Sequence, residues 1–160
     1  MKFSALLISG CVMFSAVSLA PTLALAHGDV TPQAVDTHTL PQLGEEMRKE
    51  NPYRSSAAAE EAASIGKSAY TQNCARCHGL EAVSGGMSPD LRELDNECID
   101  KKGDTEKLAC LKEVDQYFMD FTMKGKVRNG AVKMPGFNAT FTQEAVWAIK
   151  SYLETRRGKD

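Results

Sequence analysis

The string Cys74-Ala75-Arg76-Cys77-His78 is the part of the sequence whose residue types and spacing most clearly indicate chemistry. Two cysteine thiols separated by two residues can each bond to one vinyl group of a single haem. A histidine that follows at once places its imidazole beneath the haem iron. The motif therefore predicts one covalently attached haem, with Cys74 and Cys77 as thioether sites and His78 as the proximal iron ligand.

Two other uses of closely spaced cysteines fit this chain less well. A thioredoxin-like C-x-x-C follows a β-strand, whereas helix-forming residues precede Cys74. A zinc site needs further ligands, and the remaining candidates are Cys98, Cys110 and two histidines nearer the amino end. Haem attachment is therefore the favoured interpretation of the motif.

An electron carrier needs a second axial iron ligand, and a methionine thioether raises the reduction potential. The candidate methionines are Met47, Met87, Met119, Met123 and Met134. Met119 and Met123 are one helical turn apart and are expected to pack in the core. Met87 follows His78 closely, near the proximal side. Met134 lies in a loop with glycine and proline before the last predicted helix, where it can reach the opposite haem face. Met134 is favoured and Met87 stays open.

The second ring nitrogen of His78 also needs a partner. Metal-bound histidines usually donate this N–H to a carboxylate, a backbone carbonyl or water, which fixes the ring orientation. The carbonyl of Pro89 is the candidate acceptor. An ordinary turn proline explains this residue equally well.

Cys98 and Cys110 remain as a pair once the motif cysteines are assigned. Thiols in an exported protein are exposed to oxidising conditions, so we expect a disulfide between them. A bridge of this loop length contributes about 3 kcal/mol to stability in the chain-entropy model. Two buried thiols are the alternative.

The amino-terminal residues are typical of a secretory signal. Lys2 is positive, residues 3–25 are mostly apolar, and Ala24-Leu25-Ala26 fits the small-x-small cleavage rule. We expect a signal peptide over residues 1–26, cleaved after Ala26, with no membrane insertion of the mature chain. An uncleaved anchor is the alternative. Cys11 would leave with the signal, and lipidation there is disfavoured.

Composition limits the remaining classes of function. The chain has 160 residues, enough for one domain, and 42% apolar with 25% charged residues is typical of a soluble globular protein. The net charge of −2 argues against a nucleic-acid binder, which needs a basic face.

The elements that must position the motif are mainly helices. Residues 27–56 form a polar arm with Pro32, Pro41 and Pro52, in which 44–50 could form a short helix. Alanines and glutamates over 57–73 predict a helix, capped by Ser55 or Ser56, that runs directly into Cys74.

The second half of the chain contains two more predicted helices. Residues 79–113 predict a loop with at most one short helix. The apolar spacing that begins at Val114 predicts a helix ending at Gly125. A second loop contains Met134, and the last helix begins near Thr142, a good N-cap, and ends near Gly158.

Residues 57–160 resemble the class I cytochromes c. The likeness is carried by residues 74–79, a Pro-Asp-Leu segment, Met134-Pro135 and a last helix that contains a tryptophan. The resemblance implies an all-α fold wrapped around one haem c, with His78 and Met134 as axial ligands. It also implies that the first and last helices cross near a set of four residues, namely Gly66, Tyr70, Trp147 and Tyr152.

A closer resemblance extends over nearly the whole mature chain. The segments 27–37, 51–54 and 125–130 look like those of periplasmic cytochromes c that serve quinoprotein (PQQ-dependent) alcohol dehydrogenases. This likeness implies a periplasmic location, such a dehydrogenase as electron donor, and another cytochrome or a terminal oxidase as acceptor. The 92–113 insertion with its two cysteines departs from the simplest class I pattern.

The expected function is therefore one-electron transfer and not catalysis. One alternative is a five-coordinate haem enzyme or sensor that binds peroxide or a gas, which is distinguished by the absence of the Met134 ligand. Another is a tethered cytochrome subunit of a dehydrogenase complex, which is distinguished by an uncleaved amino terminus.

Overall fold

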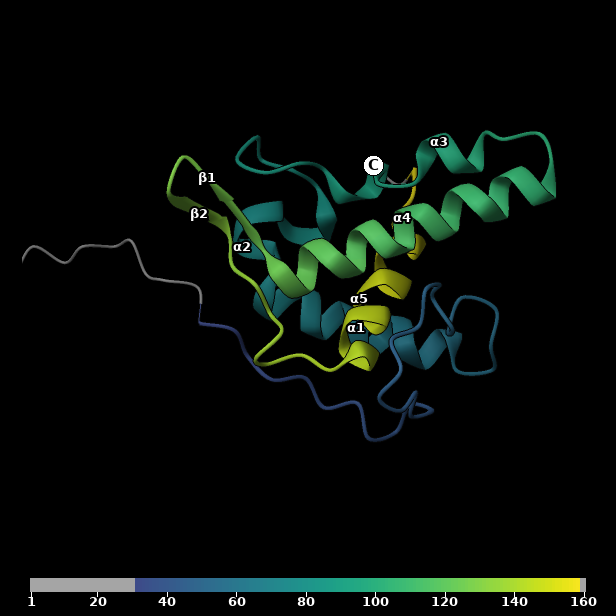
Figure 1. Cartoon of the computed structure of the whole chain (residues 1–160), viewed down its shortest axis with the longest axis horizontal. Helices are drawn as coiled ribbons and strands as arrows, with labels where there is room; N and C mark the ends of the chain where they lie inside the picture. Colours follow the sequence, from purple (N-terminus) through teal and green to yellow (C-terminus); the bar gives the residue numbers. More distant parts are fainter. Residues whose placement is uncertain (1–30, 159–160) are drawn as a thin grey trace, which may run out of the picture.

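The computed structural model describes residues 31–158, so the expected signal peptide and its cleavage site lie outside the described residues. The described part is mostly helical, as expected, with one small antiparallel hairpin (Figure 1). Its helices are α1 (Ala59–Asn73), α2 (Ala75–His78), α3 (Asn96–Ile99), α4 (Asp104–Lys124) and α5 (Gln143–Thr155), with 3₁₀ turns η1 (Leu80–Ala82) and η2 (Leu91–Glu93). The strands are β1 (Lys126–Arg128) and β2 (Ala131–Met134). Within this part, no helix is long and apolar enough to cross a membrane.

The crossing of α1 and α5 is the most extensive contact between elements. Gly66 makes it possible, because a Cβ there would lie 1.9 Å from the backbone oxygen of Ala148. The rings of Tyr70 and Tyr152 meet beside the crossing with centroids 5.4 Å apart, and Trp147 is fully buried. The expected crossing of the first and last helices is confirmed.

Gly66→Ala is expected to lower the free energy of unfolding by about 3 kcal/mol, because α1 and α5 must separate to admit the methyl group. Urea denaturation followed by circular dichroism measures the loss. Gly85→Ala is the matched control, since nothing lies within 4 Å of a Cβ at that position. Equal losses in the two variants would show that the helix crossing is not tightly packed.

Helix α4 is longer than the sequence pattern indicated. The predicted helix began at Val114, but α4 begins at Asp104, inside the region expected to be a loop. The first half has few apolar side chains, which hid it, but its first turn carries Asp104 and Glu106, which favour the helix amino terminus. A disulfide from Cys98 to Cys110 joins α3 to this half, with a Cα–Cα distance of 5.4 Å.

Replacing both Cys98 and Cys110 with serine is expected to cost about 3 kcal/mol of stability, because the unfolded chain loses a cross-link. The visible spectrum of the haem should not change, since the bridge joins α3 to the first half of α4, whereas Met134 follows the end of that helix. Urea denaturation of the variant and of the dithiothreitol-treated protein should give the same loss. Unchanged stability in both samples would mean that the bridge does not contribute.

The segment before Met134 is a hairpin and not the loop that was expected. Asn129 and Gly130 have φ values of 52° and 75° and form the two-residue turn between β1 and β2. Asn-Gly suits this turn because both central residues need positive φ. Met134 is therefore the last residue of β2.

The arm over residues 31–56 contains no helix, so the short helix considered for 44–50 is wrong. Its backbone groups bond instead to side chains at the start of α5. Glu144 accepts from the Leu43 N–H at 2.9 Å, and the Gln143 amide donates to the Gly44 carbonyl at 2.7 Å. These bonds hold the arm along α5 in an irregular path (Figure 1).

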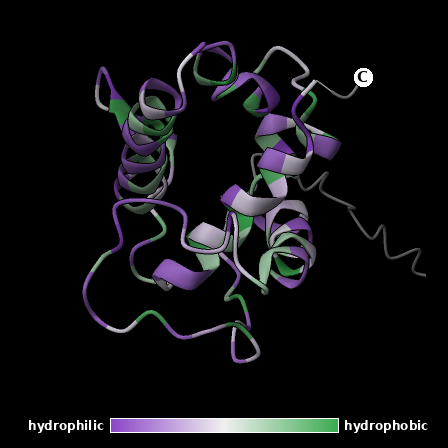
Figure 2. Ribbon diagram, turned by 90° about the vertical axis from the view of Figure 1, so that its right-hand side faces the viewer, coloured by the Kyte–Doolittle hydropathy of each residue, from purple (hydrophilic) through white to green (hydrophobic). Residues whose placement is uncertain are grey.

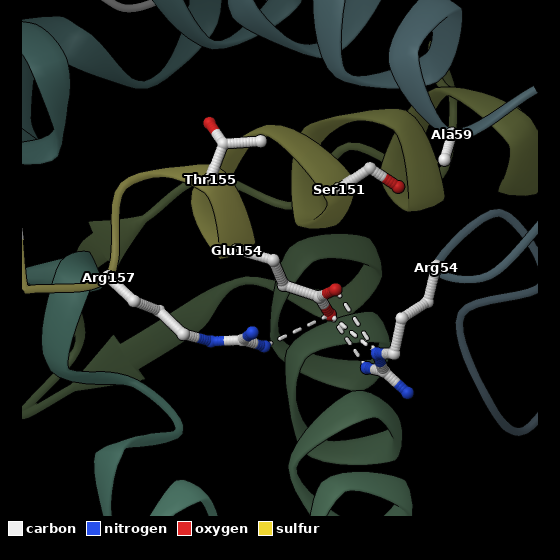
Figure 3. Close-up of a pocket in the computed structure, with 6 residues that line it drawn as sticks. All are labelled: Arg54, Ala59, Ser151, Glu154, Thr155 and Arg157. Atoms are coloured by element: carbon white, nitrogen blue, oxygen red, sulfur yellow. Dashed lines mark hydrogen bonds and ion pairs between the residues drawn. The ribbon is translucent and has the colours of Figure 1, made fainter.

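A buried ion cluster ties the arm to α4 and α5. Lys150 is 1% exposed, and its ammonium lies 2.9 Å from Asp95, 3.5 Å from Asp115 and 2.8 Å from Glu154. Figure 3 shows the Glu154 carboxylate between Arg54 and Arg157, beside a pocket. The pocket includes Ala59, the first residue of α1, and so lies about 22 Å along that helix from the cysteine motif.

Candidate functional site

The cysteine motif occupies a single helical turn that continues from α1. Cys74 ends α1, donating its N–H to the Tyr70 carbonyl at 2.8 Å, and also begins α2. The Cys74 carbonyl accepts from the N–H groups of Cys77 and His78 at 3.1 and 3.0 Å. Residues three and four apart share one face of a helix, so both sulfur atoms and the imidazole project to the same side.

Gly79 ends this turn, where a side chain would not fit. Its φ is 81°, and a Cβ would lie 1.8 Å from the carbonyl oxygen of Val83. The Tyr70 hydroxyl donates to the Gly79 carbonyl at 2.8 Å and connects the turn to the α1–α5 crossing. The helix crossing thus fixes the place where the motif ends.

His78 uses one ring nitrogen within the protein. Its Nδ1 lies 3.0 Å from the carbonyl oxygen of Pro89, and because a carbonyl can only accept, Nδ1 carries the proton. In the neutral ring Nε2 then carries the lone pair. Within residues 31–158, Nε2 has no hydrogen-bond partner, so it is available as a ligand.

Cys74 and Cys77 are both free thiols and both half-buried, whereas Cys98 and Cys110 bond to each other. The disulfide removes the last two from a shared zinc site. Burial raises the pKa of the Cys74 thiol to about 12, so the unbound thiol is neutral near pH 7. In the described part of the chain, no group of three or more His, Cys, Asp or Glu side chains is placed so that it could hold a metal ion.

Met134 is partly buried and packs on the same apolar core as Cys74. The backbone around it is tightly held, because a Cβ at Gly125 would lie 2.5 Å from the Met134 carbonyl oxygen. A Cβ at Gly136 would lie 2.8 Å from the Met123 carbonyl oxygen in α4, and the Phe137 N–H donates to the Thr122 carbonyl at 3.0 Å. The end of α4 therefore fixes the position of Met134.

The other methionines differ in burial. Met87, the rival ligand, is 79% exposed, and Met47 on the arm is exposed as well. Met119 is buried and Met123 packs on the core, as expected for residues of a helix face. Met134 and Met123 are thus the two that combine partial burial with contact to the core that Cys74 also touches.

The residues around the motif fit a haem. Two free thiols one turn apart and an imidazole with a free Nε2 are the donors that covalent attachment requires. Leu80 and Val83 follow the motif directly and are exposed, although both are aliphatic. A flat apolar group beside the motif would cover such surface.

A scan against protein-family models matches residues 61–153 to "Cytochrome C oxidase, cbb3-type, subunit III", a cytochrome c domain that spans more than half of the chain. The chain belongs to the cytochrome c family. The cytochrome therefore carries one covalently bound haem c and transfers electrons instead of acting as an enzyme. The all-α class I fold and the haem predicted from the sequence are confirmed.

Curated relatives agree with this assignment. The cytochrome is 49% identical to cytochrome c550 of Pseudomonas aeruginosa over 149 residues, which cover 92% of each chain. It is 36% identical over 91 residues to quinohemoprotein alcohol dehydrogenase ADH-IIG of Pseudomonas putida, and 30% identical over 103 residues to ADH IIB of the same species. These stretches cover only 10% and 12% of the two enzymes. No solved structure is significantly similar to the cytochrome.

Proposed function

We propose that Cys74 and Cys77 form the two thioether bonds to haem c, and that His78 and Met134 are its axial ligands. The bound haem supplies a single iron centre that accepts and releases one electron. The rest of the task falls to the protein: the helical turn holds both sulfur atoms, and the end of α4 holds the thioether. The Pro89 carbonyl keeps the proton on Nδ1 of His78, which leaves the lone pair on Nε2, where it would bind the iron.

The proposed donor is a quinoprotein (PQQ-dependent) alcohol dehydrogenase. The observation that carries this proposal is the likeness between this chain and segments of two quinohemoprotein alcohol dehydrogenases. In each of these two dehydrogenases, the segment that resembles this chain is part of the enzyme's own polypeptide. This arrangement indicates that a cytochrome of this kind can accept electrons from such a dehydrogenase. The proposed acceptor is another cytochrome or a terminal oxidase.

The proposed location is the periplasm, with a signal peptide over residues 1–26, an arm over 27–56 and the cytochrome domain over 57–160. The disulfide between Cys98 and Cys110 suits an exported protein. Mass spectrometry of the native protein tests the leader: the expected mature chain starts at His27. A mass that includes residues 1–26 would favour a tethered subunit.

Stopped-flow mixing tests the donor. A quinoprotein alcohol dehydrogenase is reduced by its alcohol without oxygen and mixed with the ferric cytochrome. The haem should be reduced at a rate proportional to enzyme concentration, with a second-order rate constant of about 10⁵–10⁷ M⁻¹ s⁻¹. The same enzyme without alcohol is the control. Reduction no faster than in that control would overturn the proposed donor.

A further inference from the structure

The β1–β2 hairpin carries an apolar pair that nothing in the described chain covers. Val127 and Val132 lie directly opposite each other across the strands and are 65% and 67% exposed. In Figure 1 the hairpin projects from the edge of the molecule, away from α3. The tip of the hairpin therefore exposes two adjacent aliphatic side chains to solvent.

The same segment concentrates positive charge on a chain whose net charge is −2. Residues 124–133 contain four basic residues and no acidic one, namely Lys124, Lys126, Arg128 and Lys133. Lys124 pairs with Asp120 at 3.0 Å, and the Lys126 ammonium lies 5.1 Å from the centre of the Phe121 ring. Within residues 31–158, Arg128 and Lys133 have no ionic partner. The tip therefore presents two exposed and unbalanced cations.

The hairpin is also held in one conformation at its base. Gly125 and Gly136 bring the end of α4 and the segment after β2 into close backbone contact. The Asn129-Gly130 turn closes the other end. A preorganised surface loses little conformational entropy when a partner binds.

We propose that the hairpin tip, defined as Val127, Val132, Arg128 and Lys133, is the docking surface for the donor dehydrogenase, through an apolar spot rimmed by carboxylates on that enzyme. This inference rests on the proposed function. Because β2 ends at Met134, a donor docked on the tip sits beside the proposed axial ligand. Small interfaces with a polar rim are typical of redox encounters.

The charge of the tip favours this occupant over two others. A second copy of the chain would bring the same cations face to face, which is repulsive. A lipid surface would receive only two aliphatic side chains, which is little apolar area for stable binding. A protein surface with an apolar spot rimmed by carboxylates can contact both the apolar pair and the cations.

Stopped-flow reduction by alcohol-reduced quinoprotein dehydrogenase tests the surface. The double variant Arg128→Gln/Lys133→Gln should react about five- to tenfold more slowly than wild type at low salt, and the difference should shrink as salt screens the charges. Val127→Ser should slow the reaction at every salt concentration. The reduction potential of each variant should equal that of wild type, since the tip contains no ligand.

The matched control is Lys101→Gln/Lys102→Gln, which removes the same charge from two exposed residues between α3 and α4. It should react at nearly the wild-type rate. If both double variants slow the reaction equally, the docking surface is refuted while the donor stands. If wild type itself is not reduced by the enzyme, although dithionite reduces it normally, the donor and the docking proposal both fail. Sedimentation that reveals a dimer lost in Val127→Ser, or wild-type binding to anionic vesicles, would assign the tip to another occupant and overturn the proposal.

Discussion

Met134→Ala should lower the reduction potential of the haem by about 0.2 V, because the thioether ligand favours ferrous iron and water or a protein group would replace it. The weak methionine-to-iron charge-transfer band at the red end of the ferric spectrum should disappear. Potentiometric titration followed in the visible range measures the potential, and the ferric spectrum measures the band. Both changes depend on ligation alone.

Met87→Ala and Met123→Ala are the matched controls. Met87 is exposed and Met123 packs on the core next to the Met134 segment, so they separate ligation from the general loss of a thioether. Each should keep the band and shift the potential by less than about 0.05 V. If Met87→Ala removes the band and Met134→Ala does not, the axial assignment is wrong. A high-spin ferric wild type would indicate a five-coordinate haem.

The parts of the site that lie close together in sequence could be predicted from it. One helical turn brings Cys74, Cys77 and His78 to one side whatever the rest of the fold does. The pattern of the last helix was equally clear, and Thr142 caps it by accepting from the Ala145 N–H. Gly66 was expected at the helix crossing because the family likeness indicated it.

Other features depend on contacts that no local pattern contains. The first half of α4 looked like a charged loop, since its stability comes from the disulfide and from packing of a few residues such as Leu111. The hairpin before Met134 did have a local signal, because Asn129-Gly130 is a strong indicator of a two-residue turn. The glycines and prolines around it, however, favour an irregular loop over a hairpin. The turn signal would also have located the proposed docking tip.

The buried ion cluster left no trace in the sequence pattern at all. Lys150 is on the α5 face that would be expected to meet only apolar side chains, and its partners come from η2–α3, α4 and α5 itself. The helices in Figure 2 are arranged around a common centre, so segments that are distant in sequence come close together. Only the tertiary fold brings Asp95 and Asp115 to one ammonium.

Lys150→Ala is therefore expected to lower the free energy of unfolding at pH 7 by about 4 kcal/mol. The loss is large because Asp95 and Asp115 are almost fully buried and would be left with less positive charge nearby. Lys124→Ala is the matched control, since Lys124 pairs with Asp120 on an exposed face and its removal should cost less than about 0.5 kcal/mol. Urea denaturation of both variants measures the two costs.

The cost of Lys150→Ala should also depend on pH. Burial by itself would raise the pKa of Asp95, but the hydrogen bond from Arg157 and the charge of Lys150 outweigh it and lower the pKa to about 2. The pKa of Glu154 is also lowered, because the hydrogen bond from Arg54 and the charge of Lys150 outweigh the effect of burial.

Carboxyls with depressed folded-state pKa values contribute their full stability above the unfolded-state pKa, and this contribution disappears as pH falls through the folded-state pKa. Wild type should therefore lose stability between about pH 4 and pH 2, and the difference between wild type and Lys150→Ala should narrow over that interval. An equal difference at pH 7 and pH 2.5 would mean that lost packing of the lysine stem, and not its charge, causes the effect.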